Sequence, residues 1–321
     1  MSSVTAVPEH ADLSLTDALT TMKNDGIGDL TVRSFKRFRH ADGFSYARAL
    51  AFQLVLTVIP GVMFFVALAA RIGEGRLREV LRAMTESLAP GPASQVILRV
   101  FEQGTDAATT GNLAAIAAGA LAMVTSGVAA MAQLQRGSSR MYGIDDDRPT
   151  SRRYGLALVL TITAGVLFAL AFVVIALGSG ITASFGEGDP RSIWIWVRWP
   201  LGIAVLPAAF ALLYRIAPHR DQPPATSLAI GSTVAVVSWF AASALLSIYL
   251  NASQVFGQTY GPLAGVIGLM FWAFSSGVVT LFGVALNAQI ESDYGGDRPV
   301  QGEPQNVQPL PALEAATGPS S

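Results

Sequence analysis

The fold is decided by one uncharged stretch that runs from Gln222 to Ile290 and reads QPPATSLAIGSTVAVVSWFAASALLSIYLNASQVFGQTYGPLAGVIGLMFWAFSSGVVTLFGVALNAQI. None of its 69 residues is Asp, Glu, Lys or Arg. Its centre, Asn251–Tyr260, is polar but uncharged, and an apolar segment flanks it on each side. Because a membrane-spanning helix needs about 20 predominantly apolar residues, the stretch predicts two spans joined by a short turn.

The composition of the whole chain agrees with a membrane location. Of the 321 residues, 51% are hydrophobic and only 13% are charged, whereas an ordinary soluble domain has roughly 25% charged residues. The mean hydropathy is +0.46. A net charge of −1 gives no overall attraction to nucleic acid, and the absence of cysteine excludes disulfides and thiolate metal sites. The sequence therefore predicts an integral membrane protein.

Further apolar tracts precede this stretch, so we predict an all-α, polytopic membrane helix bundle over residues 31–291, with amphipathic interfacial helices beside it. About six transmembrane helices are expected, at about 44–71, 109–135, 154–180, 193–215, 225–250 and 262–289. Residues 1–30 are a polar segment with no signal-peptide pattern, and a short helix is expected to begin within Leu13–Asp17. Residues 292–321 are rich in Pro, Gly, Gln and acidic residues and are expected to be disordered.

The distribution of Lys and Arg predicts the orientation. Six spans place both termini on one side, which then carries fourteen cations against seven on the other side. Because cytoplasmic loops carry the excess of Lys and Arg, we expect both termini in the cytoplasm.

Two amphipathic segments lie outside the spans. Residues 72–106 carry apolar side chains at helical spacing and are expected to form a pair of amphipathic helices that either rest on the bilayer or cap the bundle. The segment Arg33–Arg39 interleaves basic residues with Phe35 and Phe38. Such interleaving occurs in nucleic-acid binding, but directly before a hydrophobic span it favours a helix at an anionic membrane surface.

Polar residues at the ends of spans are the candidate functional residues, because polar groups in hydrocarbon are costly and often functional. Under the predicted topology the candidates gather at the cytoplasmic ends of spans one, two and six, and they are Arg48, Gln53, Gln133, Asn287 and Glu291. We hypothesise that Arg48 pairs with Glu291, and that Gln53 and Asn287 form hydrogen bonds nearby. This cluster lies on a substrate path in one interpretation and only pins helix ends in the other.

Proline and glycine mark candidate hinges and packing faces. Pro60 lies in the middle of the first span and predicts a kink, which serves either packing or gating. Gly261, Pro262 and Gly265 open the last span with small residues that allow close helix packing, either for the bundle alone or beside a substrate. Gly268, Gly277 and Gly283 are expected to extend the packing face.

Several motifs resemble the YihY/BrkB family of bacterial inner-membrane proteins. The opening of the first span, Phe44–Phe52 (FSYARALAF), is followed by Thr57–Pro60 (TVIP), as in that family. The link Leu213–Arg220 (LYRIAPHR) is similar to its basic loop. Thr259–Ile267 (TYGPLAGVI) and Gly283–Glu291 (GVALNAQIE) resemble its last span and ending, so the resemblance covers about residues 30–291.

The resemblance implies a multi-pass plasma-membrane protein of a family that has carried the label ribonuclease BN. A metal-dependent nuclease needs clustered histidines and carboxylates, whereas His10, His40 and His219 are scattered along the chain. We therefore expect no enzyme activity, no nucleic-acid partner, no metal and no cofactor. Two hypotheses remain, namely transport or flipping of an amphipathic, lipid-like envelope substrate, and a membrane scaffold. Membrane lipids are the expected partners, and the sequence leaves a homo-oligomer open.

Overall fold

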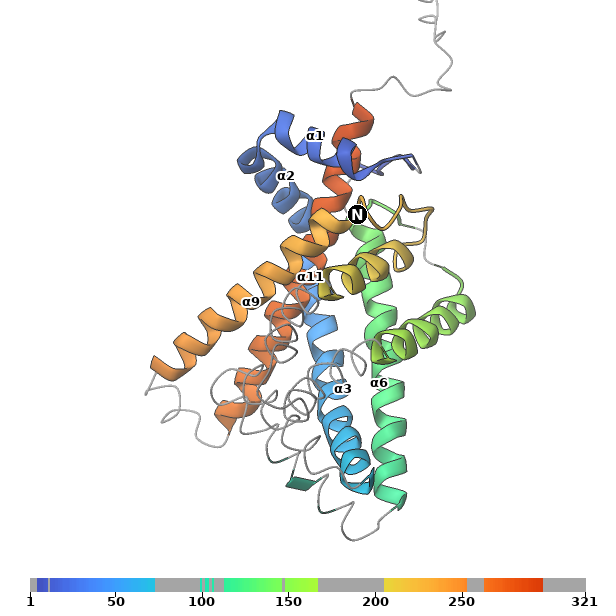
Figure 1. Cartoon of the computed structure of the whole chain (residues 1–321), viewed down its shortest axis with the longest axis vertical. Helices are drawn as coiled ribbons and strands as arrows, with labels where there is room; N and C mark the ends of the chain where they lie inside the picture. Colours follow the sequence, from blue (N-terminus) through green and yellow to red (C-terminus); the bar gives the residue numbers. More distant parts are fainter. Residues whose placement is uncertain are drawn as a thin grey trace, which may run out of the picture.

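Figure 1 shows the computed structural model, which describes residues 5–10, 12–72, 99, 102–103, 106, 113–145, 148–166, 205–252 and 263–296. Within these ranges the regular elements are helices and no strand occurs, which confirms the all-α prediction. The labelled helices are α1 (Leu15–Asp25), α2 (Ile27–His40), α3 (Gly43–Ile72), α6 (Leu113–Met141), α9 (Ala229–Ala252) and α11 (Ala264–Gly296). Two further helices occupy residues 150–166 and Val205–Ile216.

Four helices are long and apolar enough to cross a membrane, and they agree with the predicted first, second, fifth and sixth spans. The apolar segments are Gly43–Phe65, Ile116–Met141, Ala229–Leu250 and Ala264–Gly295. The helices at 150–166 and Val205–Ile216 fall within or beside the predicted third and fourth spans. The remainder of those two spans, the start of the second span, most of segment 72–106 and the tail from residue 297 lie outside the described residues.

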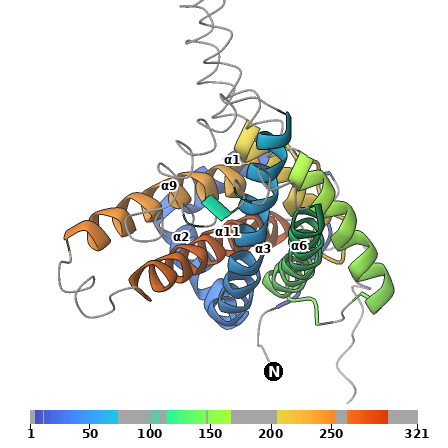
Figure 2. The ribbon, with the colours of Figure 1, turned by 90° about the horizontal axis from the view of Figure 1, so that it is seen from below.

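The last helix, α11, is the central element of the bundle. Half of its apolar segment (50%) is buried, compared with 17–22% in the other three candidate spans. It packs between α3 and α9, and α6 packs on the other side of α3 (Figures 1 and 2). Large apolar side chains on the outer faces, such as Phe52, Leu245 and Ile248, are more than half exposed. These outer faces are suited to direct contact with the acyl chains of lipids.

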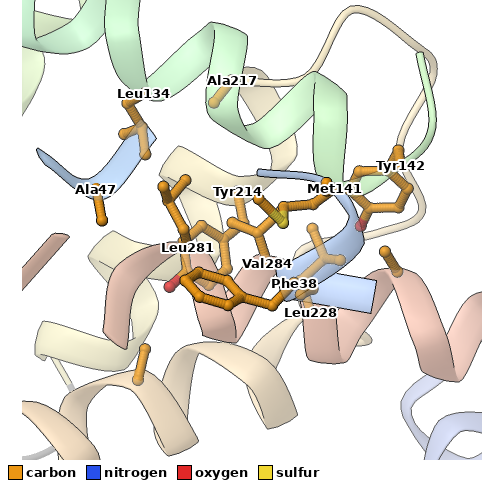
Figure 3. Close-up of a cluster of buried hydrophobic side chains, with 14 of the residues drawn as sticks. Phe38, Ala47, Leu134, Met141, Tyr142, Tyr214, Ala217, Leu228, Leu281 and Val284 are labelled. Atoms are coloured by element: carbon orange, nitrogen blue, oxygen red, sulfur yellow. The ribbon is translucent and has the colours of Figure 1, made fainter. Parts of the chain in front are cut away.

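The largest buried cluster lies toward one end of the bundle, where α1, α2 and the last turns of α11 also lie; we call this the polar end. Figure 3 shows Phe38 of α2, Tyr142 after α6, and Leu281 and Val284 of α11 within this cluster. Tyr214 joins them from the helix Val205–Ile216, and its hydroxyl donates a hydrogen bond of 2.7 Å to the carbonyl of Thr280. The cluster also includes residues of α3, α6 and α9, so these helices share one core with α2, α11 and the helix Val205–Ile216.

Glycines allow α11 to touch both neighbouring backbones. A Cβ on Gly277 would lie 2.9 Å from the carbonyl oxygen of Ala47 in α3. A Cβ on Gly283 would lie 2.6 Å from the carbonyl oxygen of Gly231 in α9, and a Cβ on Gly231 would likewise overlap Gly283. The prediction of a packing face at Gly277 and Gly283 is thus confirmed.

The other predicted packing and hinge residues are placed as follows. Pro60 lies inside α3, which is helical on both sides of it, so its role as a hinge stays a prediction. Gly265 is buried in the first turn of α11. Gly261 and Pro262 lie outside the described residues.

The polar N-terminal segment folds onto the bundle. As predicted, a short helix begins here: Ser14 and Asp17 form a reciprocal capping box at the start of α1, satisfying backbone N–H groups of the first turn. Ala18 of α1 and Leu30 of α2 pack against Leu286 and Ile290 of α11. Residues 12–40 therefore cover the end of the central helix.

The glycine contact between α9 and α11 gives a first prediction. Gly283→Ala places a methyl group against the Gly231 carbonyl and the Tyr214 hydroxyl, and overpacking of this kind costs about 1–3 kcal/mol. We expect the melting temperature of the detergent-purified protein to fall by several degrees. Gly155→Ala is the matched control, because nothing lies within 4 Å of its Cβ position. Equal melting temperatures for both variants would contradict a backbone contact at this crossing.

Candidate functional site

The last turns of α11 carry a series of buried polar side chains. Its 33 residues extend about 50 Å at a rise of 1.5 Å per residue, whereas the hydrocarbon of a bilayer is about 30 Å thick. If the span begins at Ala264, about 20 residues reach Gly283. The turns beyond Gly283 contain Asn287, Glu291 and Gln289, which are 4%, 1% and 9% exposed. We call these residues and their partners the polar cluster.

Glu291 pairs with Arg220 at the centre of the polar cluster. The Arg220 Nη2 lies 2.5 Å from the Glu291 Oε1, and the two side chains are 2% and 1% exposed. The backbone N–H of His10 donates a second hydrogen bond, of 3.1 Å, to the same carboxylate oxygen. The other oxygen, Oε2, is buried and has no hydrogen-bond partner among the described residues. The charge of Glu291 is therefore balanced mainly by Arg220.

Arg220 connects three parts of the chain. Besides Glu291, its guanidinium donates hydrogen bonds of 3.1 Å to the carbonyls of Val7 and Pro8. The same group lies over the Tyr142 ring, 4.6 Å from its centroid. One buried cation thus holds the N-terminal segment, the end of α6 and α11 together, and these added contacts offset part of the cost of removing the ion pair from water.

The predicted pair between Arg48 and Glu291 is wrong. Arg48 is exposed, and its guanidinium donates a hydrogen bond of 3.0 Å to the Ser45 hydroxyl one turn earlier in α3. The buried face of α3 contains Ala47 and Ala51 instead. Sequence reasoning counted Arg220 only as a loop cation, although it is the last basic residue before the 69-residue uncharged stretch.

Asn287 caps the neighbouring helix. Its Oδ1 accepts a hydrogen bond of 2.9 Å from the Gly231 N–H, and its Nδ2 donates one of 3.1 Å to the Leu228 carbonyl. The first N–H groups of a helix have no partner within it, and the apolar Leu228 before α9 cannot supply one. The predicted neighbour Gln53 is not involved. Gln53 and Gln133 are half-buried on α3 and α6, and no hydrogen bond between described residues joins either to the polar cluster.

Two arginines of α2 bind the end of α11. Arg37 donates a hydrogen bond of 3.0 Å from Nε to Gln289, and burial lowers its pKa from the ordinary value. Arg33 lies 3.0 Å from Asp293 and 2.8 Å from Asp25, and its pKa is raised, chiefly by the hydrogen bond with Asp25. Both guanidinium groups stay charged because even a lowered arginine pKa lies far above neutral.

Arg148 closes the other side of the polar end. It donates hydrogen bonds of 3.1 Å and 2.6 Å to the carbonyls of Ala217 and Pro218, just after the helix Val205–Ile216, and one of 3.1 Å to Gln135. Burial lowers the pKa of Arg148. The guanidinium also donates a hydrogen bond of 3.5 Å to the carbonyl of Ile216, the last residue of that helix, whose carbonyl lacks a partner within the helix. Sequence reasoning missed this role, because the two segments are far apart in the chain.

A small cavity adjoins Arg148. It has a volume of about 10 Å³ and is lined by Gln135, Arg136, Ser139, Arg148, Arg153, Ala217 and His219. A cavity of this volume holds roughly one water molecule. Among the described residues no three or more His, Asp or Glu are grouped so that they could hold a metal ion. The arrangement at the polar end therefore holds segments together through buried ion pairs and hydrogen bonds.

The Arg220–Glu291 pair gives a second prediction. Glu291→Gln leaves a buried guanidinium without its counter-charge, and breaking a buried pair costs about 3–5 kcal/mol. We expect the melting temperature in detergent to fall strongly, and Arg220→Gln to act similarly. Arg48→Gln, which removes an exposed cation, should stay close to wild type. If Arg48→Gln lowered the melting temperature as much as Glu291→Gln does, the result would favour the predicted pair between Arg48 and Glu291.

The cap supplied by Asn287 gives a third prediction. Asn287→Leu leaves the buried Gly231 N–H without its side-chain partner. It also removes one of two hydrogen bonds of the Leu228 carbonyl, which still accepts from the Ser232 N–H. An unsatisfied buried group costs about 1–3 kcal/mol. The melting temperature should fall, and hydrogen exchange in the first turn of α9 should accelerate. Gln133→Leu, the matched amide-to-leucine change on α6, should change neither measurement. Unaltered exchange in α9 with Asn287→Leu would show that the cap is dispensable.

Comparison with known proteins finds relatives with different names. The chain is 26% identical over 259 residues to the putative ribonuclease-like protein YfkH of Bacillus subtilis, covering 79% of this chain and 92% of that protein. It is 25% identical to the UPF0761 membrane protein RC1_0578 of Rhodospirillum centenum, over 79% of this chain and 55% of the relative. It is 26% identical to the UPF0761 membrane protein AZOSEA40600 of Aromatoleum aromaticum, over 77% and 60%. The chain thus spans little more than half the length of these two UPF0761 proteins.

No solved structure matches the chain significantly. The family model described as "Virulence factor BrkB" matches residues 34–308, which include the four candidate spans and the polar cluster on α11. The motifs quoted from the sequence, the helical bundle and this match agree: the chain is a membrane protein that belongs to the BrkB virulence factor family.

Proposed function

We propose that the protein resides in the inner membrane of a bacterium, with both termini in the cytoplasm, and that it transports or flips an amphipathic, lipid-like substrate of the cell envelope. The observation that carries this proposal is a seam of neutral polar side chains between α9 and α11 at membrane depth. A headgroup that crosses the bilayer needs hydrogen-bond partners there, because hydrocarbon supplies none.

The seam consists of two reciprocal contacts. The Trp239 indole N–H donates a hydrogen bond of 2.9 Å to Ser276, and the Trp272 indole N–H donates one of 3.2 Å to Ser243. Trp272 and Ser276 lie about 12 and 18 Å along α11 from Ala264, near the middle of a hydrocarbon layer about 30 Å thick. Large apolar side chains beside the seam, Phe240 and Phe271, are half exposed. If the tail of a lipid lay on that outer surface, the headgroup of the same lipid would lie close to the serine hydroxyls and indole N–H groups of the seam. These groups could then form hydrogen bonds with the headgroup.

A membrane scaffold is the second candidate function. It is supported by the same bonds, since interhelical hydrogen bonds also hold helices together in lipid. The buried pair Arg220–Glu291 and the cavity of about 10 Å³ beside Arg148 favour a filled and closed polar end. In a transporter this end would have to open during each cycle, whereas in a scaffold it would stay closed.

Vesicles that contain only this protein distinguish the two functions, which gives a fourth prediction. We expect a fluorescent phospholipid in the inner leaflet to become accessible to a membrane-impermeant quencher faster than in protein-free vesicles. The variant with Ser243→Ala and Ser276→Ala should slow this movement several-fold, because the seam then offers no hydroxyl partner to a headgroup. Ser126→Ala on α6 is the matched control and should retain the wild-type rate. Movement no faster than in protein-free vesicles would favour the scaffold.

A further inference from the structure

The helix α2 has a second face that the bundle does not use. Its inner face, with Leu30, Ser34 and Phe38, is buried against the rest of the protein. On another side Val32 is 51% exposed and Phe35 is 47% exposed. Exposed apolar side chains on a helix next to a membrane span are typical of a helix that contacts the bilayer interface.

This face borders a groove that combines apolar and basic side chains. Val32 and Phe35 of α2 and Phe282 of α11 supply the apolar surface. Lys36, Arg39 and His40 line the same groove. A lipid combines an apolar tail with a polar headgroup. The apolar surface of the groove therefore suits the tail, and its basic side chains suit an anionic headgroup.

The position of the groove places it at the boundary of the hydrocarbon. Phe282 is the nineteenth residue of α11, so it lies about 27 Å from Ala264 along a helix that crosses about 30 Å of hydrocarbon. The helix α2 is joined to the span α3 by only Ala41 and Asp42, and Asp42 has a positive φ of 55°. This tight corner keeps α2 beside the start of the span.

The cations of the groove are available to a ligand. On the same helix Arg33 is paired with Asp25, Asp29 and Asp293, and Arg37 is bonded to Gln289. Lys36 and Arg39, by contrast, are exposed and form no ion pair with any other described residue. Asp29, the acidic residue of α2, is already paired with Arg33. The groove therefore carries uncompensated positive charge over an apolar surface.

We propose that this groove binds an anionic phospholipid from the adjacent leaflet. Lys36 and Arg39 hold its phosphate by charge-assisted hydrogen bonds, and one acyl chain lies over Val32, Phe35 and Phe282. Nucleic acid also binds basic and aromatic side chains, but a groove that opens at the hydrocarbon boundary favours a ligand with an apolar tail. The site is separate from the seam between α9 and α11, so it does not depend on transport.

Native mass spectrometry of the detergent-purified full chain tests the proposal. We expect phosphatidylglycerol to remain bound in preference to phosphatidylcholine of the same acyl chains. The variant with Lys36→Gln and Arg39→Gln should bind phosphatidylglycerol about thirtyfold more weakly. Each basic residue near an anionic membrane surface contributes about 1 kcal/mol to lipid binding, and about 1.4 kcal/mol corresponds to a tenfold change in affinity. Phe35→Ala should weaken binding of both lipids. Unchanged melting temperatures would show that these variants are folded.

The matched control removes two exposed cations outside the groove, with Lys23→Gln and Arg152→Gln. It should retain wild-type affinity, and an equal loss would overturn the proposal in favour of general electrostatic attraction. Equal binding of phosphatidylcholine would also overturn it. Displacement of phosphatidylglycerol by glycerol phosphate would identify a site for soluble phosphate esters, and displacement by a single-stranded oligonucleotide would identify a nucleic-acid site. Either result would contradict a lipid site, and neither depends on the outcome of the vesicle experiment.

Discussion

The close approach of α11 to the helices on both sides is the constraint on which the bundle depends. In lipid, helices gain little from removing apolar surface from their surroundings, so association depends on van der Waals packing and interhelical hydrogen bonds. Gly277 and Gly283 let the backbone of α11 meet those of α3 and α9 directly. Only at such short separation can Asn287 reach the first turn of α9 and Trp239 reach Ser276. The polar contacts are therefore a consequence of the small residues.

Much of the fold could be predicted from the sequence, because every helix that crosses the hydrocarbon must be predominantly apolar over about 20 residues. The predicted spans at 44–71, 225–250 and 262–289 correspond to α3, α9 and α11. The end of α6 was less predictable: it extends to Met141, past Arg136 and Arg140, because the core at the polar end buries its last turns. A prediction that is based on runs of uncharged residues ends the helix at the first arginine, whereas the helix itself continues through Arg136 and Arg140.

The candidate site was predicted only in part, and the reason lies in α3. That helix is apolar on nearly all sides, so its sequence does not reveal which face meets α11 and which meets lipid. Without that orientation, Arg48 was a reasonable partner for Glu291. The actual partner, Arg220, comes from a segment whose path follows from tertiary packing alone. Asn287 and Glu291 were selected from the sequence as polar residues near the end of an apolar span, and the structure buries both of them in α11.

The order in which the chain is synthesised gives the N-terminal segment a particular role. Val7 and Pro8 leave the ribosome early, but the guanidinium that holds their carbonyls belongs to Arg220, and its counter-charge belongs to Glu291. The segment consequently cannot take up its final position until the last helix has been inserted. Docking of the N-terminal segment therefore requires the complete bundle, and a chain that ends before α11 would lack the carboxylate that holds Arg220 in place.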